Sequence, residues 1–551
     1  MVIGNKIINE LKIVETINKS VGWKYEPRGM SPGALAKAFI LSTFTDIRIP
    51  LTHLEERLSG YDLYYLLGLE SEHAINAFNA GRMLKTLGDN NPDGIYEKLA
   101  LTALQQYEIP VGRTHGDTTT ISFHGNYDIN ELELTEEEKE EVLRIEKGYN
   151  KDGRAGDAQV VVGQIVTEQG IPITNKILSG ATSDVEWNKI ALNYFDEVRE
   201  KGFNQGVFVA DSKLVTEELI KRMSNPENYV PFVSRCPANF NERLESQVIK
   251  KAYTAKEWRN IGQISEGKKA STYQMQSFVE NVFNIQMRLI VLESSSLKES
   301  AERTLEKAKE QLLPLIKKIE KREFACGEDA EKEISIFMKA KEMKLFNCTH
   351  EIKKIIKEKW PRGRRGAKTT AVITETYEIR IHELDFDNEN RESYLQNNSS
   401  FVLISNITDE NVTDEEIVKT YKGQHVVENS FRQLKQPCLA SVIYLKNPER
   451  IKGLTMLLCL SLLIRAIIQY RMRDGLKKFN EANPDEIIYA GWAGRPLFSP
   501  TFKLLYEHAF GCFYERVSSV EYRFVWSSHK IQDRVEALLN LMGISISTLL
   551  G

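Results

Sequence analysis

Apolar residues recur at helical spacing along the N-terminal part of the chain. The pattern is broken at Ser31-Pro32, where a capping residue precedes a first-turn proline, and again at Asn90-Asn91-Pro92. Breaks of this kind separate one helix from the next. The sequence therefore predicts an all-helical N-terminal domain over residues 1–108.

The pattern then changes to short β-branched runs that are separated by turn residues. The segments VGRTHGDTTTISFHG, DAQVVVGQIVTEQ and IPITNKILS favour three strands in a meander. A helical stretch from Ser183 to Gly202 follows, then the strand GVFVAD, which ends at Asp211, a short helix and the strand YVPFVSRC. The order β-β-β-α-β-α-β predicts an α/β core over residues 109–236.

Long charged helical runs and then the alternating segment ITETYEIRIHEL occupy residues 237–398. Helices are predicted from Ser277 to Arg322 and from Ala330 to Met343. We interpret this part of the chain as an inserted lobe that is mostly helical.

The core is expected to resume over residues 399–436, with the strand SFVLISN and a helix from Thr413 to Gln436. That helix opens with Thr-Asp-Glu-Glu, a capping box in which Thr and Glu side chains bond the free backbone N–H groups. Residues 437–551 are predicted to form a helical C-terminal region.

Length, charge and cysteine usage limit which classes of protein this chain can belong to. A chain of 551 residues exceeds one compact domain. Its 73 basic and 77 acidic residues give a net charge of -4, so any DNA-binding surface must be local. The six cysteines form no C-x-x-C pair and are interpreted as reduced thiols. No signal peptide is visible, and the longest apolar run, Leu454 to Ile464, is about half of the roughly 20 residues that a membrane span needs. We therefore expect a cytoplasmic protein with no membrane partner.

Asp117 and Asp211 are candidates for a metal site. Asp117 lies in the first strand of the meander, and Asp211 ends the strand after the first helix. A crossover helix returns the chain parallel to the first strand, so these two strands can be neighbours. Adjacent carboxylates repel each other unless a cation lies between them, and their hard oxygens suit Mg²⁺ or Mn²⁺. The pattern alone also allows Asp117, in Gly-Asp-Thr, to belong to a turn.

Glu428 is the candidate for the third carboxylate. It is in the middle of its predicted helix, with Tyr421 seven residues before it and Lys435 seven residues after it, so the three share one face. Two metal ions could then activate water or a 3′-hydroxyl for attack on a phosphodiester, while Arg432 and Lys435 hold backbone phosphates. The same spacing also fits an exposed helix stripe without chemistry.

The densest basic segment, KKIIKEKWPRGRRGAK, contains Arg362, Arg364 and Arg365. We interpret it as a clamp on the DNA backbone that supplies affinity rather than sequence recognition. The alternative is a solvated loop within the insert. The histidines show no zinc-site spacing, and His115 and His425 are interpreted as structural.

The segment YKGQHVVENSFRQLK resembles the third-carboxylate helix of the insertion-sequence-4 superfamily of transposases, which carries Tyr-x2-Arg-x3-Glu-x6-Lys. Tyr421, Glu428 and Lys435 match in identity and spacing, whereas Gln424 replaces the Arg and weakens one expected DNA contact. GYNKDGRAGDAQVVVGQIVTEQGIPI is similar to the family's Gly-Tyr-Ser-Lys-Asp stretch. DTTTISFHG and GVFVADSKL resemble its two Asp strands, although Ser212-Lys213 replaces a basic residue and Gly. The insertion-sequence-1634-like group is the most similar branch.

The resemblance implies an RNase H-like mixed-sheet core with a helical N-terminal domain, a large insert and a helical C-terminal region. It implies a site of the DDE (Asp-Asp-Glu) type in which Asp117, Asp211 and Glu428 hold two Mg²⁺ ions, for which Mn²⁺ can substitute. The partners it implies are double-stranded DNA, as terminal inverted repeats and as target, and a second copy of the chain in a synaptic complex. The reaction would be cut-and-paste transposition, and the N-terminal domain could bind the element end.

Two other functions stay open at this point. A decayed relative on the same scaffold would bind DNA without cutting it. A helical interaction protein would require the strands predicted around residues 114–178 to be wrong.

Overall fold

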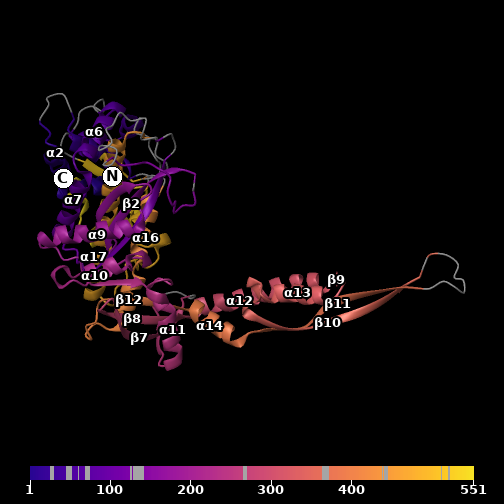
Figure 1. Ribbon diagram of the computed structural model, residues 1–551. Coiled ribbons are helices and arrows are strands. Elements are labelled where there is room, and N and C mark those ends of the chain that lie inside the picture. Colours follow the sequence, from indigo (N-terminus) through magenta and orange to yellow (C-terminus); the bar gives the residue numbers. More distant parts are fainter. Residues whose placement is uncertain are drawn as a thin grey trace. The chain divides into compact units, whose positions relative to one another are not determined.

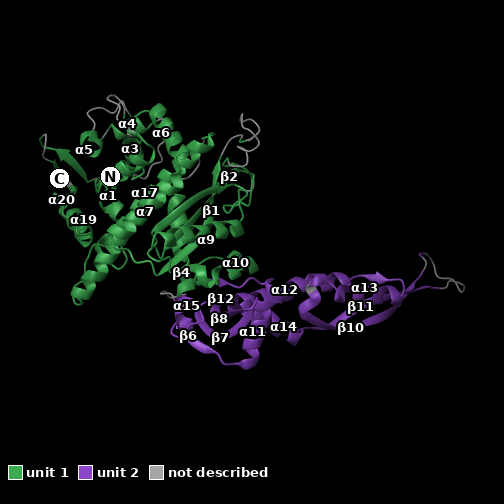
Figure 2. Ribbon diagram, turned by 60° about the vertical axis from the view of Figure 1, so that its left-hand side comes forward, with its two compact units in different colours: residues 1–233, 420–551 green, residues 234–419 purple. Residues whose placement is uncertain are grey.

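The computed structural model forms two compact units (Figure 2): residues 1–233 with 420–551, called unit 1, and residues 234–419, called unit 2. The predicted N-terminal domain, both Asp strands and the C-terminal region belong to unit 1, and the predicted insert belongs to unit 2. The five predicted domain boundaries stay a prediction. The structure describes all residues except 25–29, 45–52, 60, 69–74, 124–126, 128–141, 155, 265–269, 361, 363–370, 437–438, 440–444, 511, 519–521 and 551.

Five strands of a mixed sheet, in the order β3-β2-β1-β4-β5, organise unit 1. Figure 1 labels β2 among the helices of this unit. The first three strands form an antiparallel meander, and β4 and β5 run parallel to β1. This arrangement is RNase H-like, so the predicted fold class is confirmed. The strands are β1 (Arg113–Phe123), β2 (Ala158–Thr167), β3 (Pro172–Ser179), β4 (Val207–Val209) and β5 (Phe232–Arg235).

Helix α9 (Asp184–Glu200) crosses from β3 to β4 and covers one face of this sheet. Its Phe195 ring packs edge-on against Phe208 of β4, with the ring centroids 5.0 Å apart. Helix α10 (Glu217–Met223) connects β4 to β5. Because successive strand residues point to opposite faces, the neighbours of Phe208 in β4 face away from α9.

The N-terminal helices of unit 1 pack against α17 (Pro448–Ala482), the longest helix in the described part of the chain. A Cβ at Gly453 would lie 2.1 Å from the Leu84 carbonyl oxygen, so glycine permits this close helix contact. Where this region is described, its α-helices are α1 (Val2–Glu10), α2 (Ile13–Ser20), α3 (Pro32–Ser42), α4 (Leu54–Leu58), α5 (Leu63–Leu67), α6 (Ala77–Asp89) and α7 (Pro92–Gln106).

Among the described residues, α17 is the one helix long and apolar enough to cross a membrane by length and composition. Its most apolar 18-residue window is 89% buried inside the structure, as is typical of a core helix. The chain ends with α18 (Phe502–His508), the hairpin β13 (Phe513–Arg516) and β14 (Tyr522–Val525), α19 (His529–Leu541) and α20 (Ile546–Leu550).

In unit 2, the strands β12, β8, β7 and β6 are antiparallel neighbours in that order. The turn between β7 and β8 consists of Phe283 and Asn284, both with positive φ, as tight hairpins require. The helix predicted from Ser277 to Arg322 is therefore wrong over residues 277–294, which belong to β7, its turn and β8. Side chains alternate in burial along the end of β7. The strands are β6 (Arg259–Gln263), β7 (Thr272–Val282), β8 (Ile285–Ser294) and β12 (Ser400–Ser405).

The segment SFVLISN forms β12 as predicted, and β12 pairs with β8. Its assignment to a second part of the catalytic core stays a prediction. The rest of unit 2 packs helices on a long hairpin around Leu312, Phe337 and Ile379. The elements are α11 (Leu244–Ala255), α12 (Ser295–Glu320), β9 (Glu323–Phe324), α13 (Gly327–Met338), β10 (Phe346–Lys359), β11 (Val372–Phe386) and α14 (Asn388–Ser399).

Candidate active site

Asp117 lies within β1, and Asp211 lies two residues beyond the end of β4, the parallel neighbour of β1. The strands β1 and β4 pair in register at His115 and Val209. Each aspartate follows its paired residue by two positions, so both point to the same face of the sheet. Neighbouring strands are about 4.8 Å apart, and the charge of Asp117 raises the pKa of Asp211. The structure thus brings together two of the three predicted carboxylates.

Both carboxyl groups have raised pKa values. Burial, followed by the charges of Asp184 and Asp117, raises the pKa of Asp211 from 3.8 to about 6, although the Lys213 backbone N–H donates to its Oδ1 at 3.0 Å. Burial also raises the pKa of Asp117, against the opposing effect of Lys151. Crowded, partly desolvated acids of this kind favour added positive charge.

Asp184 is a third acid in this cluster, and the sequence analysis missed it. It lies in the first turn of α9, and its Oδ1 accepts a hydrogen bond from Thr118 Oγ1 at 2.6 Å. The Nζ of Lys151 is 3.2 Å from Asp117 Oδ1 and 3.2 Å from Asp184 Oδ1. A helix that leaves the meander begins near the end of β1. The position of Asp184 directly after the Ser183 cap could therefore have predicted from the sequence that it lies near Asp117.

The loop that carries Lys151 is held by Asn150, a buried residue. The Asn150 side-chain amide donates to Ser122 Oγ at 3.1 Å and to Gln159 Oε1 at 2.9 Å. Its Oδ1 accepts two backbone N–H groups of the loop, including that of Asp152 at 2.9 Å. This segment is the Gly-Tyr-Asn-Lys-Asp stretch of the sequence, and its contacts direct Lys151 toward the acids.

Helix α16 (His425–Leu434) carries Glu428 and covers the face of the sheet to which Asp117 points. Its Val427 is buried against β2. Its Ser430 Oγ donates to Gln164 Oε1 at 2.8 Å, and Gln164 is the strand partner of Asp117. The helix with the third predicted carboxylate therefore lies over the strands with the other two.

The helix predicted from Thr413 to Gln436 is divided at Gly423 into α15 (Asp414–Lys422) and α16. A Cβ at Gly423 would lie 3.1 Å from Cε1 of His115, so the chain approaches the sheet most closely here. Glu428 consequently lies in the first turn of α16, and the expectation that it stands in mid-helix is wrong.

No hydrogen bond or ion pair joins Glu428 to Asp117 or Asp211 in the described part of the chain, and the Glu428 side chain is exposed. Within the same residues, no three His, Cys, Asp or Glu side chains are arranged to hold a metal ion. The ammonium group of Lys151 lies among the acids instead.

The predicted DNA contacts on α15 and α16 have protein partners. Lys435 Nζ is 2.7 Å from each carboxylate oxygen of Asp152. Arg432 is exposed, and its Nη1 donates to Asn429 Oδ1 at 2.9 Å. Tyr421 is half-buried near the end of α15.

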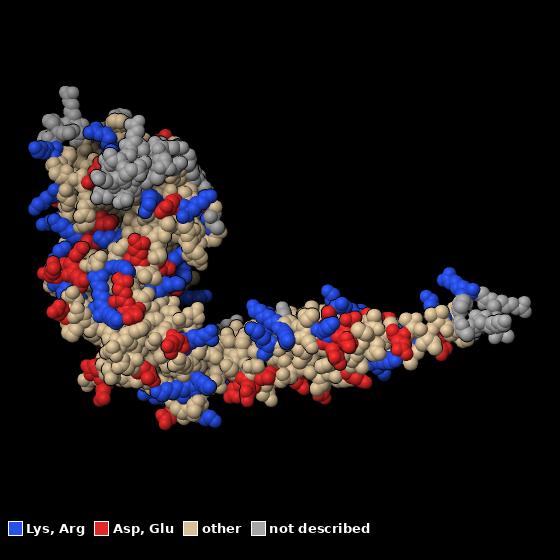
Figure 3. All heavy atoms as spheres, viewed as in Figure 1, with Lys and Arg blue, Asp and Glu red and all other residues tan. Residues whose placement is uncertain are grey.

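The basic segment of unit 2 lies only partly within the described residues. Arg362 is exposed, whereas Arg364 and Arg365 lie outside the described residues. Within the segment, Lys354 pairs with Glu375 of β11 at 2.7 Å. Figure 3 shows Lys and Arg side chains interspersed with Asp and Glu on the visible face. Part of the basic charge near this segment is therefore compensated.

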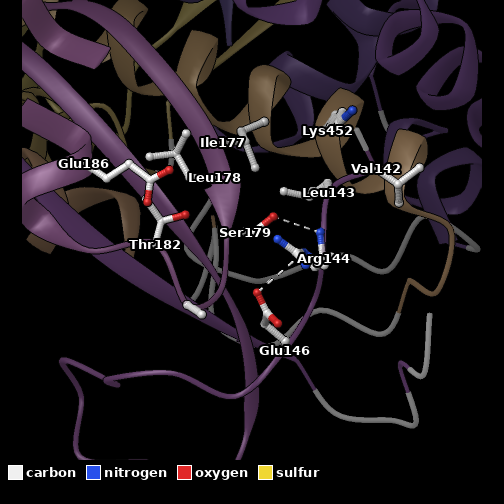
Figure 4. A pocket seen from close by; sticks show the side chains of 11 residues that line it. Val142, Leu143, Arg144, Glu146, Ile177, Leu178, Ser179, Thr182, Glu186 and Lys452 are labelled. Carbon is white, nitrogen blue, oxygen red and sulfur yellow. Dashed lines mark hydrogen bonds and ion pairs between the residues drawn. The ribbon is translucent and has the colours of Figure 1, made fainter. Parts of the chain in front are cut away.

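A separate cavity of about 390 Å³ lies between residues 142–146 and the end of β3 (Figure 4). The Arg144 backbone N–H donates to Ser179 Oγ at 3.1 Å at its edge, and Lys452 of α17 also lines it. None of the predicted site residues lines this cavity.

The chain matches the family described as transposase DDE domain over residues 165–464, more than half of its length. The matched range includes Asp211 and Glu428 and begins after Asp117. No curated protein matches the chain. Among solved structures, the chain is similar to a piggyBac transposase in a cryo-EM synaptic complex with hairpin DNA, with 10% identity, a TM-score of 0.38, and coverage of 86% of this chain and 74% of that one. On the family match, the chain belongs to the transposase DDE domain family.

Proposed function

We propose that this transposase binds the terminal inverted repeats of an insertion sequence and catalyses Mg²⁺-dependent strand cleavage and strand transfer. The observation that carries the proposal is the alignment of Asp117 with Asp211 on one face of neighbouring parallel strands, in a chain of the transposase DDE domain family. The match of Tyr421, Glu428 and Lys435 to the insertion-sequence-4 pattern supports that superfamily. The helical N-terminal domain and the segment DTTTISFHG support the insertion-sequence-1634-like group within it.

The donor set fits divalent cations. Asp117 and Asp211 offer the hard carboxylate oxygens that Mg²⁺ and Mn²⁺ prefer. The raised pKa of both groups supports a place for added positive charge, and the position of Lys151 among the acids supports the same conclusion. We assign Asp117, Asp211 and Glu428 as the ligands of two ions. When bound, these ions supply the charge that activates the attacking oxygen and stabilises the leaving oxygen.

The position of α16 supports the role of Glu428. Glu428 stands seven residues before Lys435, close to two helical turns, so the two side chains share one flank of the helix. Lys435 bonds to Asp152, which directly follows Lys151. We infer that Glu428 completes the site from this flank when DNA is bound.

The proposed chemistry is two displacements at phosphorus. A water oxygen forms the first new P–O bond at the element end, and the 3′ oxygen leaves with the bonding electrons. The freed 3′-hydroxyl then attacks a phosphodiester of the target DNA, whose own 3′ oxygen leaves. Tyr421, Arg432 and Lys435 would hold the DNA backbone beside these steps.

The basic segment with Arg362, Arg364 and Arg365 would add affinity that does not depend on sequence. We further propose that two copies of the chain join the two element ends in a synaptic complex. The reaction would take place in the cytoplasm, on the nucleoid DNA.

Strand cleavage of a labelled duplex that carries the flanking inverted repeat tests the proposal. The intact protein is compared with Asp211→Ala and Glu428→Ala, in Mg²⁺, in Mn²⁺ and without metal. Asp196→Ala is the matched control, because Asp196 is also a partly buried acid of unit 1 but pairs with Arg222 at 2.6 Å.

Metal-dependent cuts at the repeat end that are lost in both site variants and kept in Asp196→Ala would support the proposal. Binding without cleavage would favour a decayed relative. Absence of both binding and cleavage would contradict a DNA transposase and favour an interaction protein.

A further inference from the structure

Lys151 places a cation inside the acidic cluster. Its Nζ lies 3.2 Å from Asp117, 3.2 Å from Asp184 and 3.0 Å from the Thr118 carbonyl oxygen. The Lys151 side chain is 27% exposed, and the side chains of Asp117 and Asp184 are 23% and 28% exposed. Three short contacts with oxygen in a half-buried site distinguish this lysine from a surface ion pair.

The cluster has more acids than bases. The charge of Asp184 raises the pKa of Asp117 and of Asp211, and Lys151 is the cation that contacts Asp117 and Asp184. One ammonium beside three carboxylates leaves an excess of negative charge. The site is therefore partly neutralised and still attractive to a further cation.

The backbone of the loop is held in place, whereas the side chain of Lys151 is free to change its conformation. Asn150 holds the backbone of the loop, whereas the ammonium is carried on a flexible four-carbon stem. Asp184 is fixed in the first turn of α9 by its bond from Thr118. If Asp117 were occupied, Asp184 would still offer Lys151 an anionic partner without any movement of the loop.

We propose that Lys151 is a built-in counter-cation of the active site, which neutralises Asp117 and Asp184 before a divalent ion binds and withdraws from Asp117 onto Asp184 when that ion arrives. This inference rests on the proposed metal site. Lys151 then stabilises the metal-free protein and competes with the ion for Asp117. It is a positioning residue, because its effect on the reaction is exerted through Asp117.

The test is the binding of Mn²⁺ alone to the full chain, measured by isothermal titration calorimetry without DNA. Lys151→Met is expected to lower the dissociation constant of Mn²⁺ about 10-fold, because an opposing charge a few ångströms away is removed. The melting temperature without metal should fall, and the increase on adding Mn²⁺ should grow. Lys151→Arg keeps the charge, so its affinity for Mn²⁺ should stay close to that of the intact protein.

Lys176→Met is the matched control. Lys176 is another half-buried lysine of unit 1, and its Nζ lies 2.8 Å from Glu97 and 3.9 Å from Asp93. Its removal should lower the melting temperature but leave Mn²⁺ affinity unchanged. If Lys151→Met does not fold, Lys151→Gln takes its place, with the same expected direction.

Unchanged or weaker Mn²⁺ binding in Lys151→Met, or in Lys151→Gln where it replaces that variant, would overturn the inference. Asp211→Asn separates this failure from failure of the metal site. If the intact protein binds Mn²⁺ and Asp211→Asn does not, the site stands and only the role of Lys151 fails. If the intact protein binds no Mn²⁺, or Asp211→Asn binds it equally well, the metal site itself is contradicted and the inference falls with it.

Discussion

Two clusters in unit 1 each combine a half-buried lysine with carboxylates, but they are built differently. In the first cluster, Lys176 of β3 meets Asp93 and Glu97, which lie one turn apart on the single helix α7. Glu97 also accepts a hydrogen bond from Thr174 Oγ1 at 2.6 Å. One helix face therefore meets one strand, and the polar groups satisfy one another where the two elements pack.

In the second cluster, the groups come from four separate segments. Asp117 is on β1, Asp184 begins α9, Asp211 follows β4, and Lys151 is on a loop. Convergence at the carboxyl end of parallel strands is the usual position of ligand sites in open α/β sheets. The two clusters therefore differ in construction rather than in composition, and this difference makes the second cluster the candidate site.

The pKa values alone would not distinguish the clusters. Burial is the largest cause in both, and it raises the pKa of Asp93 and that of Asp211 to about 6. Structural ion-pair networks perturb pKa values as functional sites do. The same substitution, Asp to Asn, made in each cluster should therefore show which cluster takes part in catalysis.

The largest expected effect is on strand cleavage. Asp117→Asn and Asp211→Asn should lower the cleavage rate by on the order of 10³-fold, because several kcal/mol of metal-dependent stabilisation is lost. Asp93→Asn should stay within about threefold of the intact protein, since that acid only supports packing. A comparable loss in Asp93→Asn, measured on the same labelled duplex, would remove the distinction between the clusters.

A smaller effect is expected in the pH dependence of stability without metal. The pKa of Asp211 is about 6 in the folded protein against an ordinary 3.8, so the folded state binds more protons between these values. The free energy of unfolding therefore decreases as pH rises from about 4 to about 6, and Asp211→Asn should reduce that decrease by about 1 to 2 kcal/mol. Asp93→Asn should act in the same direction.

Added Mn²⁺ should distinguish Asp211 from Asp93. With saturating Mn²⁺, the ionised form of Asp211 is favoured, so the intact protein should become more stable than Asp211→Asn at pH 7, while the effect of Asp93→Asn is unaltered. Denaturant unfolding at several pH values measures both. An equal response of the two variants to Mn²⁺ would place no metal at Asp211.

The smallest expected effect concerns the link between α16 and the Lys151 loop. The Lys435 and Asp152 side chains are 24% and 41% exposed, so Asp152→Asn should cost only about 0.5 kcal/mol of stability. It should leave DNA affinity unchanged or higher, because Lys435 remains available for phosphate.

Lys435→Met should weaken DNA binding in a filter-binding assay. Weaker DNA binding in Asp152→Asn would show that Lys435 acts through this ion pair.

The strands of the core were predictable because β-branched runs and turn residues mark them locally. The alignment of Asp117 with Asp211 followed from the rule that a crossover helix returns a strand parallel to the first. The hairpin from Thr272 to Ser294 was missed, because β8 is buried along most of its length and lacks the alternation that marks a strand, and because its turn, Phe283-Asn284, contains no glycine.

The contacts around the site could not be predicted from the sequence, for another reason. Asp184 and Lys151 are far apart along the chain, and only the packing of α9 and the loop brings them together. The division of the helix at Gly423 likewise depends on its close approach to His115, a tertiary contact. Local patterns predict elements, whereas such convergence depends on how the elements pack.

The most direct test of the central claim is the position of Mn²⁺ in a crystal of the intact protein, located by its anomalous scattering. We predict a peak between Asp117 and Asp211, about 2.2 Å from a carboxylate oxygen of each. Lys151 should then contact Asp184 and no longer Asp117. An anomalous peak elsewhere, or none at these two aspartates under saturating Mn²⁺, would contradict the account.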